Sequence, residues 1–239
     1  MKIACVLIND RFYNQFLKIK KYYKFIYAIE IRVDTFYPDL QKIASIATIL
    51  KKKFPDIQLI LTFRKFEEGG KIKISEEKRK ETILNFLKTF KNLFNFVDIE
   101  FKSPIKYEIY EFLKKNKKNI IFSIHFLKKY KENTLYKELL QIKNYIKDKR
   151  IKNYIVKVVA KISDFSEYFK TLKKTYKILK DINYTFFTTG KTSTISRCIS
   201  VILEMPLVYA ALTKPVIKTQ PDISELLSSL KKLGLENKN

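Results

Sequence analysis

The sequence predicts an α/β protein, and in particular a (β/α)8 TIM barrel formed by a single domain over residues 1–239. Three observations support this. Apolar runs of strand length recur along the chain, amphipathic segments separate them, and their starts are mostly roughly 25–40 residues apart. About eight such units in a chain of this length suit a closed barrel. The alternative is an open doubly wound sheet, but no glycine-rich turn of the dinucleotide-binding kind follows the first run.

The predicted elements follow one another in alternation. The apolar runs that predict strands are 3–8, 25–33, 57–63, 96–101, 120–124, 154–162, 184–187 and 207–212. The amphipathic segments that predict helices are 39–53, 75–94, 107–116, 128–147, 164–180, 192–203 and 222–233. Ser75, followed by two glutamates, is a typical helix start, and Asp222 after a proline is another.

One run, residues 153–164, is unusual because a lysine interrupts it. Its valines and isoleucines are typical of a strand that is buried on both faces. Burial of Lys157 disfavours the charged ammonium and therefore favours the neutral amine, which can attack a ketone to form an imine. The alternative is a structural lysine whose stem packs in the core while its ammonium reaches solvent at the strand end.

Composition limits the class of protein. The hydrophobic content is 46%, which is ordinary for a globular protein. The chain lacks a run of about 18 uncharged apolar residues, so we expect no contact with a membrane. The apolar N-terminal run is too short for a secretory signal and predicts the first strand. Only two cysteines occur, Cys5 and Cys198, so we expect no disulfide framework or metal site and a cytoplasmic location.

The formal net charge of +25 raises the question of nucleic-acid binding. The lysines are spread from end to end, however, without a basic arm, an RNA-binding signature or a helix-turn-helix pattern. We therefore interpret the charge as a lysine-rich surface that keeps the protein in solution and attracts anionic substrates. No nucleic-acid partner is predicted.

Polar residues gather toward the C-terminal ends of the predicted strands. Side chains two residues apart on a strand lie on the same face of the sheet. This rule places the following residues together in pairs, one pair on each of four strands: Glu30 with Arg32, Thr62 with Arg64, Asp98 with Glu100, and Ser123 with His125. Lys157 lies on the strand that follows the last of these. In a barrel that end carries the active site. Charge that points inward from five strands indicates a catalytic site more strongly than a structural ion pair.

His125 is the only histidine, so acid–base catalysis near neutral pH falls to it or to a tuned carboxylate. A lone histidine on an apolar strand is often structural, but His125 lies one strand before Lys157, and the two would be neighbours in a barrel. Glu68 follows the third strand, beside a Gly69-Gly70 turn. Arg197, near the start of the helix after the seventh strand, is either a surface arginine or a cation for an anionic group.

These residues resemble those of the type I 3-dehydroquinate dehydratases over nearly the whole chain. The matching motifs are Glu30-x-Arg32-x-Asp34, Thr62-Phe63-Arg64-x-x-x-Glu68-Gly69-Gly70, Val97-Asp98-Ile99-Glu100, Ser123-x-His125, Val156-Lys157, Gly190-Lys191-Thr192 with Ile195-Ser196-Arg197, and Gln220. Each motif alone is weak. Together they occur in the right order on successive strand ends, which makes the match specific.

The resemblance implies a (β/α)8 barrel, commonly a homodimer, that needs no metal or organic cofactor. It implies the dehydration of 3-dehydroquinate to 3-dehydroshikimate by syn elimination in the shikimate pathway of aromatic amino acid biosynthesis. Lys157 would form the Schiff base, His125 would be the general base and then acid, and Glu68 would orient and tune His125. The residues implied for substrate binding are Glu30, Arg32 and Arg64 on the hydroxyl-bearing side, and Arg197 and Gln220 at the carboxylate.

The chain departs from the family in the lid before the last helix. A Ser-Ala-Pro-Gly-Gln segment is usual there, whereas this chain has Val216-Ile217-Lys218-Thr219-Gln220. The serine hydroxyl that contacts the carboxylate has no counterpart at Val216, and Lys218 or Thr219 are the candidates to replace it.

Two other functions remain open from the residues. A class I Schiff-base aldolase acting on sugar phosphates needs glycine-rich phosphate loops at the last strands, but only Gly190 lies there among four glycines. A non-catalytic basic barrel that binds nucleic acid requires no reactive lysine. Neither explains the combination of Glu68, His125 and Lys157.

Overall fold

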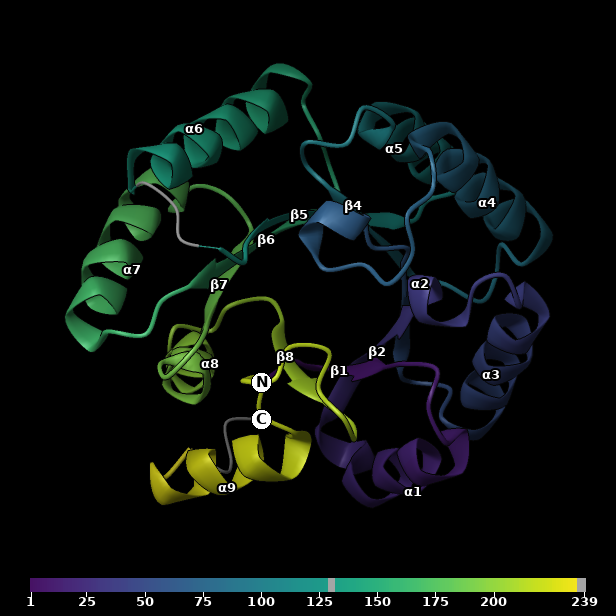
Figure 1. Ribbon diagram of the computed structural model, residues 1–239, viewed down its shortest axis with the longest axis horizontal. Coiled ribbons are helices and arrows are strands. Elements are labelled where there is room, and N and C mark those ends of the chain that lie inside the picture. Colours follow the sequence, from purple (N-terminus) through teal and green to yellow (C-terminus); the bar gives the residue numbers. More distant parts are fainter. Residues whose placement is uncertain (129–131, 236–239) are drawn as a thin grey trace.

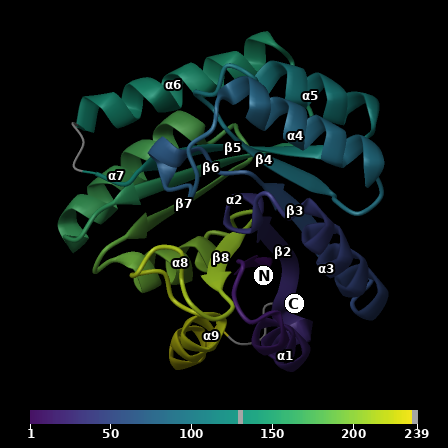
Figure 2. The same ribbon diagram turned by 45° about the vertical axis from the view of Figure 1, so that its right-hand side comes forward.

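The protein is a barrel of eight parallel strands surrounded by helices (Figures 1 and 2). A computed structural model describes residues 1–128 and 132–235. The strands are β1 (Ile3–Leu7), β2 (Ile26–Arg32), β3 (Gln58–Thr62), β4 (Phe96–Glu100), β5 (Asn119–Phe126), β6 (Tyr154–Lys161), β7 (Tyr184–Thr189) and β8 (Val208–Ala211). Hydrogen-bonded neighbours follow the order β7-β6-β5-β4-β3-β2-β1-β8. The predicted TIM barrel and all of its predicted strands are confirmed.

The helices cover the outside of the strands (Figure 1). The helices are α1 (Phe12–Tyr22), α2 (Val33–Phe36), α3 (Leu40–Lys53), α4 (Glu76–Thr89), α5 (Lys106–Lys115), α6 (Glu132–Asp148), α7 (Phe165–Leu179), α8 (Ser193–Ile202) and α9 (Ile223–Lys232). Every predicted amphipathic segment contains a helix, although residues 129–131 of the segment 128–147 lie outside the described residues. No helix in the described part of the chain has the length and apolar character to cross a membrane.

Helix α1 was missed by the sequence analysis, and its local signals explain why. No side chain caps its start at Arg11, and it buries only Gln15 and Ile19. The predicted starts of α4 and α9, by contrast, are confirmed. Ser75 accepts a hydrogen bond from the backbone N–H of Lys78, and Asp222 accepts one from that of Glu225. Caps of this kind each stabilise a helix by about 1 kcal/mol.

Two layers of buried apolar side chains pack against the strands of the barrel. The larger lies between the strands and the helices, and the smaller fills the barrel interior. Ile155 and Val159 belong to the interior layer, and Lys157 stands between them on the same face of β6. The period-two prediction for this strand is therefore confirmed. The smaller layer therefore surrounds Lys157 with apolar side chains inside the barrel.

The seam between β7 and β8 is closed by side chains. Among the described residues the strand ladder ends at these two strands. Arg197 of α8 spans them, because its Nε donates to Tyr209 O on β8 at 2.6 Å and its Nη1 donates to Thr188 O on β7 at 3.0 Å. Thr185 Oγ1 adds a bond to Leu207 O at 2.6 Å. Arg197 is thus anchored to both strands at the edge of the barrel mouth.

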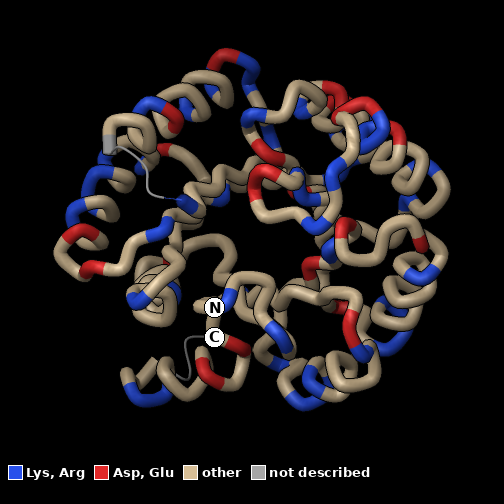
Figure 3. Tube along the Cα trace, viewed as in Figure 1, with Lys and Arg blue, Asp and Glu red and all other residues tan. Residues whose placement is uncertain are grey.

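The charged residues divide into an outer and an inner set. Figure 3 shows Lys and Arg on the helices around the whole circumference of the molecule. This distribution agrees with the lysine-rich surface expected from the sequence. The acids Glu30, Asp98 and Glu100 are instead buried inside the barrel, at 3% exposure or less. Buried acids need partners, and those partners define the site.

Candidate active site

A cavity of about 340 Å³ opens at the C-terminal ends of the strands. Residues from β1, β2, β5, β6, β7 and β8 line it, together with Arg197 of α8 and the segments that follow β3, β5 and β8. All eight residues predicted for the site line this cavity, namely Glu30, Arg32, Arg64, Glu68, His125, Lys157, Arg197 and Gln220. The barrel topology therefore brings residues that are far apart in the sequence together in this one cavity.

Lys157 lies deep in the cavity and is only 4% exposed. Its Nζ donates to Asp98 Oδ2 at 2.8 Å and lies 3.4 Å from Glu30 Oε1. The alternative in which the ammonium reaches solvent at the strand end does not hold. The sequence analysis anticipated the desolvation of Lys157 but not its two carboxylate partners. Burial removes water from this nitrogen, and the two carboxylates take the place of that water as its partners.

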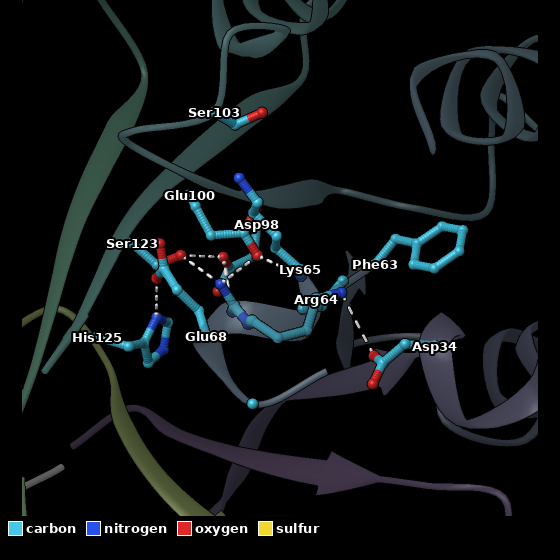
Figure 4. Close-up of polar contacts among 12 residues, drawn as sticks. Asp34, Phe63, Arg64, Lys65, Glu68, Asp98, Glu100, Ser103, Ser123 and His125 are labelled. Atoms are coloured by element: carbon cyan, nitrogen blue, oxygen red, sulfur yellow. Dashed lines mark hydrogen bonds and ion pairs between the residues drawn. The ribbon is translucent and has the colours of Figure 1, made fainter. Parts of the chain in front are cut away.

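Arg64 at the end of β3 neutralises the buried acids. Figure 4 shows its guanidinium among the carboxylates of neighbouring strands. Its Nη2 lies 2.8 Å from Asp98 Oδ1, and its Nη1 donates to Glu100 Oε1 at 3.0 Å. Burial alone would lower the pKa of Arg64, but Asp98, Glu100 and Glu30 together raise it above its usual range. Arg64 is therefore a permanent positive charge in the floor of the site.

Asp98 is shared between two cations. Burial would raise the pKa of this carboxyl, but Arg64 and then Lys157 lower it below its usual range. Ser123 also donates to Asp98 Oδ1, at 2.6 Å. Asp98 is thus a carboxylate with fixed orientation beside the Lys157 nitrogen.

Arg79 supports the buried acids from outside the cavity, and the sequence analysis missed it. It lies on α4, is 2% exposed, and donates from Nη1 to Glu100 Oε2 at 2.6 Å. Its Nη2 donates to Glu76 Oε2 at 2.8 Å and to Ser103 Oγ at 2.9 Å. An arginine in the first half of an amphipathic helix looks like a surface charge in the sequence. Only the packing of α4 against β4 shows that Arg79 holds Glu100 in position for Arg64.

His125 and Glu68 form a contacting pair. His125 Nδ1 lies 2.9 Å from Glu68 Oε2. Burial, followed by Arg64 and Lys157, lowers the pKa of His125 well below its usual range. Burial and the nearby Glu100 raise the pKa of Glu68 to about 8. Both shifts favour a neutral imidazole, and when its proton is on Nδ1, bonded to Glu68, the Nε2 lone pair is available as a base.

The loop that carries Glu68 has a backbone that requires glycine. Glu68 ends a short turn, Phe66–Glu68, and Gly69 adopts a left-handed φ of 90°. A Cβ on Gly70 would lie 2.2 Å from Arg64 O, which is far closer than atoms can approach. The Gly69-Gly70 pair, noted in the sequence only as a loop mark, therefore sets the approach of Glu68 to His125.

Asp34 fastens the same loop to β2. Both of its oxygens pair with Arg32, from Nε and Nη2, each at 2.9 Å. It also accepts from the backbone N–H of Arg64 at 3.3 Å and of Lys71 at 3.0 Å. Arg32 Nη2 donates in addition to Gly69 O at 3.1 Å. Bidentate pairing fixes the Arg32 guanidinium at the edge of the cavity.

Arg197 differs from the other buried arginines of the site. It is 1% exposed and bonds through Nε and Nη1 to backbone oxygens and to Ser193 Oγ. Arg32, Arg64 and Arg79 each pair with a carboxylate, whereas Arg197 has no ion pair among the described residues. Burial accordingly lowers the pKa of Arg197 below its usual range. A buried cation without a counter-ion at a cavity wall favours an anionic ligand.

The segment before α9 covers one side of the cavity. Val216, Ile217 and Gln220 line it. Thr219, one candidate to replace the missing serine, has its Oγ1 bonded to the backbone N–H of Gly190 at 2.9 Å. Thr219 therefore fastens this segment to the loop after β7, and Gln220 is left as the polar group that faces the cavity.

Comparison with known proteins gives a consistent result. A family model described as "Type I 3-dehydroquinase" matches residues 5–237. The chain is 30% identical over 233 residues to a 3-dehydroquinate dehydratase of Pyrococcus abyssi, covering 97% of this chain and 98% of the relative. It is 29% identical over 198 residues to a 3-dehydroquinate dehydratase of Thermococcus gammatolerans, covering 82% and 86%.

Solved structures share the fold. A type I 3-dehydroquinate dehydratase from Clostridium difficile, with covalently modified comenic acid, superposes with a TM-score of 0.77 at 21% identity. The superposition covers 97% of this chain and 92% of the other. This likeness supports the barrel architecture derived above.

Proposed function

Because this chain belongs to the type I 3-dehydroquinase family, we propose that its barrel cavity dehydrates 3-dehydroquinate through an imine on Lys157. The protein is a hydro-lyase of the shikimate pathway. The product is 3-dehydroshikimate. The observation that carries the assignment of residues is the meeting of Lys157, His125 and Glu68 in one buried cavity.

The first step is attack of the Lys157 amine on the ring ketone. The ammonium must lose a proton before the attack, and that proton is returned when the carbinolamine hydroxyl leaves as water, which gives a protonated imine. That imine carries a positive charge on the nitrogen that the ammonium occupied. Asp98 Oδ2, at 2.8 Å from this nitrogen, is placed to stabilise the charge. Glu30, at 3.4 Å, supports it from β2.

The second step is the removal of a proton next to the imine carbon. The iminium withdraws electrons from that carbon, so a base of modest strength is sufficient. His125 takes the proton through Nε2 while Glu68 holds Nδ1. The resulting enamine expels the hydroxyl group on the next carbon, and the His125 imidazolium returns its proton, so that water leaves. Hydrolysis of the conjugated imine then releases the product and restores Lys157.

Orientation of the substrate requires recognition of its carboxylate. Arg197 is a buried arginine of the cavity that has no carboxylate partner among the described residues, and Gln220 faces the same cavity. We assign the carboxylate to this pair. Arg32, Arg64 and Glu30 then lie on the hydroxyl-bearing side, where Arg64 acts mainly through its charge because its guanidinium is bonded to acids. Orientation of this kind lowers the entropic part of the barrier.

The oligomeric state and the location belong to the proposal as well. We propose a homodimer in the cytoplasm, with residues 1–239 as one catalytic domain. Phe165 and Phe169 on α7 are each 52% exposed and Tyr176 is 56% exposed, which forms an apolar stripe of the kind that interfaces cover. Both cysteines are free and buried, which suits a reducing compartment.

The assay that tests the function follows the conjugated enone of 3-dehydroshikimate by its ultraviolet absorbance. The wild type should turn over 3-dehydroquinate, and His125→Ala should form the imine but lose turnover by at least about 10²-fold, the usual scale of general acid–base catalysis. Arg197→Gln should raise KM more than it lowers kcat. A wild-type chain that produces no enone would contradict the proposed function.

A further inference from the structure

Tyr209 is a buried aromatic residue at the edge of the active site that the proposed mechanism does not use. It lies on β8, is 2% exposed, and belongs to the apolar layer inside the barrel. Its ring rests against Phe187 of β7, with the ring centroids 5.5 Å apart. It also lines the cavity. The side chain is thus held rigidly under the reacting groups.

The face of the Tyr209 ring is directed at Lys157. The Lys157 Nζ lies 4.1 Å from the ring centroid, well inside the range of about 6 Å for a cation–π contact. The other lysine cation–π contacts in the described part of the chain are longer, from 4.8 Å for Lys174 over Tyr136 to 5.9 Å for Lys114 over Tyr110. The contact at Tyr209 is both shorter and desolvated, and desolvation strengthens it.

The hydroxyl of Tyr209 takes no part in this arrangement. Its oxygen is buried and has no hydrogen-bond partner among the described residues. A phenol whose hydroxyl is unpaired is held in place by its ring. The ring is therefore the part of Tyr209 that serves the site, and a phenylalanine would preserve it.

We propose that the ring of Tyr209 stabilises the protonated imine on Lys157, as the aromatic counterpart of Asp98. The inference rests on the proposed function, because it concerns the charge that the imine carries. The ammonium has three N–H donors and the imine nitrogen only one, so the positive charge stays while hydrogen bonds are lost, and the electron-rich ring face stabilises the imine more than the ammonium. Asp98 and the ring then hold the nitrogen in one position while the substrate is attached.

The test varies the electron density of the ring at nearly constant size. Tyr209→Phe is the baseline, and phenylalanines with one, two and three ring fluorines are placed at position 209 by stop-codon suppression. Each protein is incubated with 3-dehydroquinate and reduced with borohydride, the fraction with an adduct on Lys157 is measured by mass spectrometry, and kcat is measured in parallel. Circular dichroism and thermal melting confirm that each variant is folded.

We expect Tyr209→Phe to match the wild type within about twofold. Each added fluorine should then lower the imine fraction and kcat, by roughly tenfold over the whole series, the size of a desolvated cation–π contact. A flat fluorine series would overturn the proposal, because a purely structural ring does not respond to electron density. So would a loss at Tyr209→Phe as large as that of Tyr209→Leu, since the hydroxyl would then be the functional group. Absence of any adduct in the wild type would overturn the proposed function itself.

Discussion

Lys157 and Asp98 form a buried ion pair in which Nζ lies 2.8 Å from Oδ2. The other oxygen of the same carboxylate lies 2.8 Å from Arg64 Nη2. The pair therefore connects the Lys157 nitrogen to a fixed positive charge just after β3. A lysine paired in this way is fixed in position, and its positive charge is compensated by a buried carboxylate.

Asp98→Asn should reduce the amount of imine on Lys157. The amide keeps the shape of the side chain but removes the negative charge that stabilises the protonated imine, and we expect roughly a tenfold loss or more. Borohydride trapping under saturating 3-dehydroquinate measures this amount. Asp181→Asn, which removes an acid that is half exposed at the surface, is the matched control and should leave trapping unchanged. Equal trapping in both variants would contradict the role of Asp98.

Arg64→Met should destabilise the protein strongly. The change leaves the buried Asp98, Glu100 and Glu30 without their shared cation, and the loss of one partner from a buried ionic cluster costs about 3–5 kcal/mol. Denaturant unfolding gives this free energy. Arg11→Met, at an exposed arginine, should change the free energy of unfolding by less than about 0.5 kcal/mol. A comparable value for the two variants would mean that the acids are not charged in the folded protein.

Gly70→Ala should disconnect Glu68 from His125. The new Cβ cannot fit 2.2 Å from Arg64 O, so the loop must move. We expect kcat to fall by at least about tenfold, because small displacements of catalytic groups have large effects. Gly234→Ala is the control, because a Cβ at that glycine meets no atom within 4 Å. If Gly70→Ala kept full activity, the backbone of this loop would not set the geometry of the pair.

The pH dependence of kcat/KM should show that His125 stays neutral in mildly acidic solution. The base must be unprotonated to act, so protonation of His125 removes activity as the pH falls. Burial and the cations Arg64 and Lys157 lower the pKa of His125 well below its usual range, which moves that loss to lower pH. We therefore expect kcat/KM to be nearly constant from pH 7 down to about 6. Half-loss near pH 6.5, the value of an unperturbed histidine, would contradict this environment.

The sequence was sufficient to predict the barrel and the inward-facing residues, because both depend on local periodicity. Lys157 and Asp98 each interrupt an apolar strand, and the period of two places them on the inner face without any knowledge of packing. The motif resemblance then supplied the roles of His125, Glu68 and the substrate-binding residues. Those roles remain proposals, whereas the convergence of these residues in one cavity is observed.

The features of the site that could not be predicted depend on contacts between elements that are distant in the sequence. Arg79 resembles any helix arginine until α4 packs against β4, and Tyr209 resembles an ordinary core aromatic until its ring is seen under Lys157. Arg197 is bonded to Ser193 of its own helix and to backbone oxygens of two strands, and no side-chain motif can reveal the contacts to the strands. Helix α1 lacked a cap and a broad apolar face, so its local signals were too weak.

The central claim is that Lys157 forms a covalent imine with the substrate. The most direct measurement is reduction with borohydride in the presence of 3-dehydroquinate, followed by peptide mass spectrometry of the wild type and Lys157→Ala. The account predicts a stable adduct on Lys157 in the wild type, its absence in Lys157→Ala, and loss of enone formation in that variant. An unmodified Lys157 in a protein that still forms 3-dehydroshikimate, or an adduct located on another lysine, would contradict it.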